Sequence, residues 1–194
     1  NALTLSAALS QGKIGEYVAQ PFVKFAETIS RVPDRFTNWK AEEYLAPTAT
    51  YYLPMDSSKP TALEVIDPSC LYCKKLFANI KIAGFETRHN LTYLVYPIED
   101  NTTTSGYKFP HSYMIARYLE ALKTFPLPNS DRAGDWLLLE KIFTGKDADG
   151  TELQTKFVSM YSTEEAETKL TELIVEIGYS RMTVADIIVK SKSP

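Results

Sequence analysis

The residues best suited to chemistry in this sequence are Cys70 and Cys73, the only two cysteines in the chain. The two residues between them allow both sulfurs to lie in the first turn of a helix, close enough to bond. Unpaired backbone N–H groups and the positive end of the helix dipole stabilise a thiolate at the first position. Because thiolates attack disulfides and thiols do not, we predict that Cys70 is the nucleophile and that Cys73 resolves the mixed disulfide.

The sequence around the cysteines predicts a βαβ unit. Residues 62–66 have the pattern of a strand that ends at Asp67-Pro68, residues 70–82 have helical spacing, and residues 90–98 form a strongly apolar strand. This order predicts two parallel strands joined by a helix, with the cysteine pair at the junction between strand and helix. In that context the pair favours redox chemistry over a zinc site, which usually needs four ligands, or an inert pair.

The stretch that contains the pair, Asp67-Pro68-Ser69-Cys70-Leu71-Tyr72-Cys73-Lys74-Lys75-Leu76, resembles the active-site stretch of bacterial periplasmic disulfide isomerases and oxidases, the Dsb family. The shared features are an acidic residue and a proline before the motif, a tyrosine or histidine before the second cysteine, and a lysine-rich first helix. The resemblance implies an α/β, thioredoxin-like three-layer fold with a helical insertion. It also implies disulfide exchange with protein substrates, a redox partner that resets the pair, no cofactor, and a periplasmic or otherwise extracytoplasmic location.

Four further residues receive roles through this resemblance. Pro68, Leu71 and Tyr72 are expected to tune the stability of the thiolate; Leu71 stands where proline or glycine is more usual. Glu64 lies six residues before Cys70, where the family places a buried acid that accepts or relays the proton of the second cysteine. The alternative is an exposed strand glutamate. Strand alternation places Glu64 on the same face as Ile66, which favours partial burial and a raised pKa.

We divide the chain into four parts: an N-terminal helical arm (1–48), a thioredoxin-like βαβ core (49–99), a helical insertion (100–178) and a return towards the core (179–194). The arm either forms a homodimer, as in isomerases of the resembling family, or packs on its own domain. Within the core, residues 50–53 are predicted to be a strand that either forms a hairpin with residues 62–66 or lies beside them as an adjacent strand.

The end of the chain has two interpretations, because the family places a cis-proline loop there. In one, Thr183-Val184 is a degenerate loop and residues 185–189 are a strand. In the other, residues 184–192 are a helix with a capping box that starts at Thr183. Ser193-Pro194 then marks the cis-proline, and the sequence stops before the last strands of the fold.

The composition limits the classes of partner. The net charge of −3 gives no reason to expect a nucleic acid or an anionic membrane, and no apolar run reaches the ~18 residues that a membrane span needs. His89 and His111 fit no metal-ligand spacing and are predicted to be surface or loop residues. The alternative function is a thioredoxin-like module that binds client proteins as a chaperone and needs no redox activity.

Overall fold

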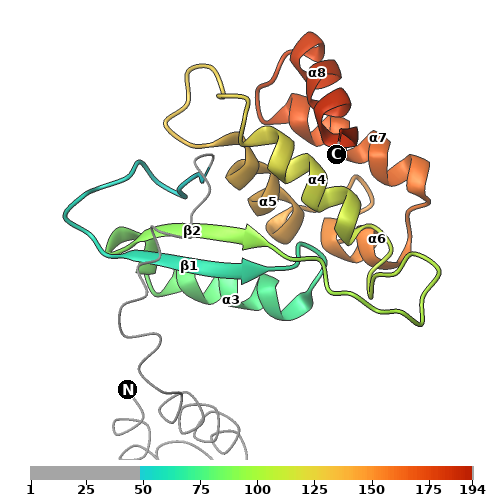
Figure 1. Cartoon of the computed structure of the whole chain (residues 1–194), viewed down its shortest axis with the longest axis horizontal. Helices are drawn as coiled ribbons and strands as arrows, with labels where there is room; N and C mark the ends of the chain where they lie inside the picture. The colour runs from blue at the N-terminus through green and yellow to red at the C-terminus, as the bar shows by residue number, and fades with distance from the viewer. Residues whose placement is uncertain (1–48, 194) are drawn as a thin grey trace, which may run out of the picture. The chain divides into compact units, whose positions relative to one another are not determined.

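The computed structural model describes residues 49–193, and Figure 1 shows their arrangement. The predicted N-terminal arm, and with it the prediction of a dimer, lies outside the described residues. The described part is a mixed α/β structure with one small parallel sheet. Its elements are β1 (Thr61–Ile66), α3 (Leu71–Ile82), the short 3₁₀ helix η3 (Phe85–Thr87), β2 (Asn90–Val95), α4 (Ser112–Leu122), α5 (Gly134–Thr144), α6 (Leu153–Ser159), α7 (Thr163–Glu176) and α8 (Arg181–Lys192).

The predicted βαβ unit is confirmed. β1 and β2 pair in parallel, with Thr61 opposite Asn90 and Ile66 opposite Val95, and α3 connects them. The side chains of β1 alternate as expected near its end, since Ile66 is 2% exposed and Val65 is 62% exposed. The sheet has two strands within residues 49–193, so the larger thioredoxin-like sheet stays a prediction.

The predicted strand at residues 50–53 and its hairpin with β1 are wrong. The backbone N–H of Tyr52 donates to the carbonyl of Leu91 at 2.9 Å, and Thr92 Oγ1 donates to the carbonyl of Thr50 at 2.8 Å. The segment therefore lies beside β2 rather than β1, without forming a regular ladder. Its tyrosine-rich pattern instead reflects core packing, because Tyr52 is 3% exposed.

An aromatic cluster joins the strands to the helices. The ring of Trp136 on α5 meets Tyr52 and Tyr93 edge to face, with centroid distances of 5.4 and 4.5 Å. Phe77 on α3 packs against Phe143 on α5 at 5.6 Å. Helix α3, which begins at the cysteine motif, is thus attached to the helical group that gathers beside the strand pair in Figure 1.

The C-terminal residues confirm the helical interpretation over the strand. Helix α8 covers residues 181–192 and packs on α4 and α7. Its cap is Ser180, whose hydroxyl accepts from the N–H of Thr183 at 3.1 Å, so the predicted start at Thr183 is three residues late. No cis peptide bond occurs in residues 49–193, and none of the helices in that range is both long and apolar enough to cross a membrane.

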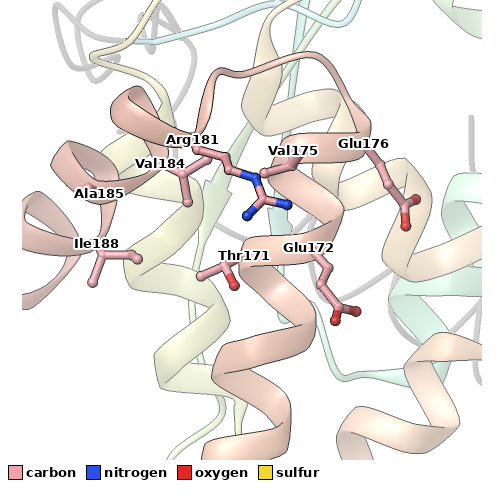
Figure 2. Close-up of a pocket in the computed structure, with 8 residues that line it drawn as sticks. All are labelled: Thr171, Glu172, Val175, Glu176, Arg181, Val184, Ala185 and Ile188. Carbon is pink, nitrogen blue, oxygen red and sulfur yellow. The ribbon is translucent and has the colours of Figure 1, made fainter.

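Helices α7 and α8 enclose a groove of about 600 Å³, shown in Figure 2. The side chain of Arg181 extends across it towards Thr171, while Glu172 and Glu176 point away along the other side of α7 (Figure 2). None of the residues that line this groove belongs to the cysteine motif.

Candidate redox site

A tight turn places the first cysteine at the start of α3. The N–H of Cys70 donates to the carbonyl of Asp67 at 3.0 Å, which closes a four-residue turn with Pro68 at its second position. The carboxylate of Asp67 accepts from the N–H of Ser69 at 2.8 Å and so reinforces the same turn. Cys70 follows as the N-cap residue of α3, and its side chain makes no capping hydrogen bond. Its sulfur therefore lies at the N-terminus of α3 without being held by a capping bond.

The structure brings the two cysteines together. The two residues lie 3.8 Å apart, and both are free, partly exposed thiols. Burial, with a smaller contribution from the neighbouring Cys70, raises the pKa of the Cys73 thiol to about 11. Cys73 is thus held as a neutral thiol at neutral pH, as a resolving cysteine should be before the first step.

Asp67 fixes the turn to the rest of the molecule through a buried carboxylate. Its Oδ1 accepts the bond from Ser69 described above, and its Oδ2 accepts from the N–H of Ile98 at 2.7 Å. Its Oδ1 also accepts from the hydroxyl of Ser112, the first residue of α4. Asp67 itself is 2% exposed. Three donors therefore compensate the burial of this carboxylate, and sequence reasoning missed Ser112 because its partner lies 45 residues away.

Helix α6 supplies two more contacts that the sequence did not predict. The side-chain amide of Gln154 donates from Nε2 to the carbonyls of Pro68 and Cys70, at 3.1 and 3.2 Å. Glu152, the N-cap residue of α6, pairs with Lys74 at 2.7 Å. The motif is thus held from one side by the turn after β1 and from another by α6.

Glu64 is neither the exposed strand residue of the alternative interpretation nor a fully buried one. Its side chain is partly buried, and one carboxylate oxygen, Oε1, is inaccessible and has no hydrogen-bond partner. Burial raises the pKa of Glu64 to about 7. A carboxyl group with this pKa can exchange a proton near neutrality. The role of Glu64 towards Cys73 stays a prediction.

The three predicted tuning residues have different surroundings. Pro68 is buried within the turn, whereas Leu71 and Tyr72 are 51% and 77% exposed. Lys75, one turn further along α3, lies 5.8 Å from the ring centroid of Tyr72. Leu71 and Tyr72 therefore form part of the surface that any protein approaching Cys70 would meet. The hydroxyl of Ser69, next to Cys70, is buried without a partner.

The two histidines have different surroundings. His89 stacks on Phe85 with ring centroids 3.9 Å apart. His111, predicted to be a surface or loop residue, does lie in the turn before α4, but it is not on the surface: it is 4% exposed, and its Nδ1 lies 2.6 Å from the carbonyl of Phe157. Within residues 49–193 no group of three or more His, Cys, Asp or Glu side chains is arranged to hold a metal ion.

Comparisons with known proteins give no family for the chain. No family model, no curated protein and no solved structure matches it. The geometry of the cysteine pair and the resemblance of its motif remain as the indications of function.

Proposed function

We propose that this protein is a thiol–disulfide oxidoreductase that exchanges disulfides with protein substrates through Cys70 and Cys73. The observation that carries the proposal is the position of the pair, 3.8 Å apart at the start of a helix that follows a parallel strand. The motif's resemblance to the Dsb family supports a thioredoxin-like fold, the role of an oxidase or isomerase, and an extracytoplasmic location. We propose this fold, role and location together with the exchange activity.

The exchange proceeds in two steps. The thiolate of Cys70 attacks one sulfur of a substrate disulfide, forms a mixed disulfide, and releases the other substrate sulfur as a thiolate. Cys73 then loses its proton, to Glu64 in this proposal, and attacks the sulfur of Cys70. A Cys70–Cys73 disulfide forms, the second substrate sulfur leaves, and two electrons have passed to the substrate. Oxidation of a substrate dithiol is the same sequence in reverse, and a dithiol or disulfide redox partner resets the pair.

A second candidate is a module that binds client proteins without redox activity. The observation in its favour is the apolar surface next to Cys70, where Leu71, Tyr72 and Leu76 are 51%, 77% and 47% exposed. The same surface also suits an exchange enzyme that must receive protein substrates. The two candidates differ in whether activity depends on the sulfur of Cys70.

The reactivity of the two thiols towards iodoacetamide tests the proposal. We expect Cys70 to be alkylated at least about tenfold faster than Cys73 below pH 7. The reason is that a thiol whose pKa is raised to about 11, as burial raises that of Cys73, holds almost no thiolate there. Peptide mass spectrometry after timed quenching separates the two sites. If both thiols react slowly and only at high pH, Cys70 is not an activated nucleophile and the proposal fails.

A further inference from the structure

Among the polar contacts of the motif, those of the Gln154 side chain join residues that are furthest apart in the sequence. It is 4% exposed, and its single nitrogen Nε2 donates to the carbonyls of both Pro68 and Cys70. These two carbonyls lie on either side of Ser69, so one amide group holds the loop at two points. The ion pair between Glu152 and Lys74 holds the first turn of α3 against the same end of α6.

We infer that Gln154 is a positioning residue for the redox pair, which holds the loop so that the sulfur of Cys70 stays at the N-terminus of α3. This inference rests on the function proposed above and extends it to a residue outside the motif. Gln154 touches neither sulfur through a hydrogen bond that the structure describes, so its effect on the chemistry passes through the backbone of Cys70.

The physical reason lies in how a helix terminus stabilises an anion. The N–H groups of the first turn act over a short range and only along their own direction. Cys70 is the N-cap residue, and its carbonyl already accepts the N–H of Lys74 at 3.1 Å, the first helical hydrogen bond. Gln154 donates to the same oxygen and to that of Pro68, which fixes the orientation of the loop relative to the helix. Without this donor the loop gains freedom, and a thiolate at Cys70 spends less time beside the N–H groups.

A neutral substitution at Gln154 separates this effect of loop position from an effect of charge near Cys70. The titratable and charged groups next to the Pro68–Cys70 loop are Asp67 before the turn, Cys73 and Lys74 on α3, and Glu152 on α6. Replacing Gln154 by methionine changes none of them, because both side chains are neutral and similar in length. A change in the reactivity of Cys70 would therefore report the loss of the two hydrogen bonds.

The experiment is the pH profile of Cys70 alkylation in the full chain, with Gln154→Met compared with the unaltered protein. Thr155→Met serves as the matched control, since Thr155 is the exposed next residue on α6. We expect Gln154→Met to move the midpoint of the profile to higher pH and to slow alkylation below the midpoint by about three- to tenfold, the size of a helix-terminus effect. Thr155→Met should leave the profile in place.

A purely structural role for Gln154 would lower the melting temperature and leave the midpoint where it is, and that result would overturn the inference. If Gln154→Met does not fold, Gln154→Leu decides the question, because leucine is also uncharged and donates neither bond, so the midpoint must again rise. The proposed function is judged separately, from the unaltered protein. Slow alkylation of its Cys70 at all pH values below 8 contradicts the function, whereas the shift between proteins still decides the role of Gln154.

Discussion

Replacing Cys70 by serine is expected to reduce disulfide exchange to the uncatalysed background. A serine hydroxyl cannot form a mixed disulfide, so the first step of the proposed reaction has no nucleophile. Cys70 is partly exposed at the start of α3, and the substitution exchanges one atom, so we expect the fold to be retained. The measurement is the rate at which the protein, in a glutathione buffer, forms or rearranges disulfides in a reduced or scrambled substrate protein.

Cys73→Ser is the matched variant for this experiment. It keeps Cys70 and removes only the resolving thiol, so the mixed disulfide between Cys70 and the substrate should accumulate and be visible on a non-reducing gel. Full activity of Cys70→Ser in an assay of client protection would contradict the oxidoreductase and favour the binding module. Equal loss in both variants without a trapped intermediate would contradict the assigned order of the two cysteines.

Replacing Glu64 by glutamine is expected to stabilise the protein at alkaline pH. The pKa of Glu64 is raised from about 4.5 to about 7 by burial, so the folded state holds the proton more tightly than the unfolded state. Stability of the unaltered protein should therefore fall as the pH rises from about 4.5 to about 7. After allowance for solvent screening of a partly exposed group, the free energy of unfolding should fall by about 1–2 kcal/mol over this range. Glutamine carries no charge and avoids this cost.

Thermal unfolding of both proteins between pH 4 and pH 9 measures the effect. We expect the melting temperature of Glu64→Gln to exceed that of the unaltered protein above pH 7 by roughly 2–8 °C, and the two curves to converge below about pH 4.5. Glu99→Gln, at an exposed position, is the control and should show no such difference. The exchange rate gives the functional readout: a slower second step supports proton transfer from Cys73 to Glu64, and an unchanged rate removes Glu64 from the mechanism.

The parts of the fold that the sequence predicted well are those with strong local signals. The βαβ unit was recognisable from an apolar strand, a helical repeat and a second strand. Residues 50–53 were mistaken for a strand because their aromatic side chains fit a ladder as well as a core. The contact of Tyr52 with Trp136 shows that core packing accounts for the pattern here.

The cysteine pair could be found from the sequence because its two residues are close together along the chain. The residues that support the pair could not be found in this way. Gln154 lies 84 residues from Cys70 on a seven-residue helix that the sequence pattern did not predict. Ser112 reaches Asp67 across 45 residues. No local pattern marks a glutamine or a serine as a partner of a distant turn, because such contacts arise only when the tertiary structure brings the elements together.

The reduction potential of the Cys70–Cys73 pair shows whether this protein is an oxidising disulfide exchanger. The protein is equilibrated in glutathione buffers of increasing ratio of reduced to oxidised glutathione, and the fraction with a disulfide is counted by mass spectrometry after thiols are blocked. We expect an intramolecular disulfide with a potential of about −100 to −200 mV, the range of extracytoplasmic oxidases and isomerases. A pair that forms no disulfide in any buffer would contradict the redox function. A potential of about −270 mV or below would contradict the oxidising, extracytoplasmic role.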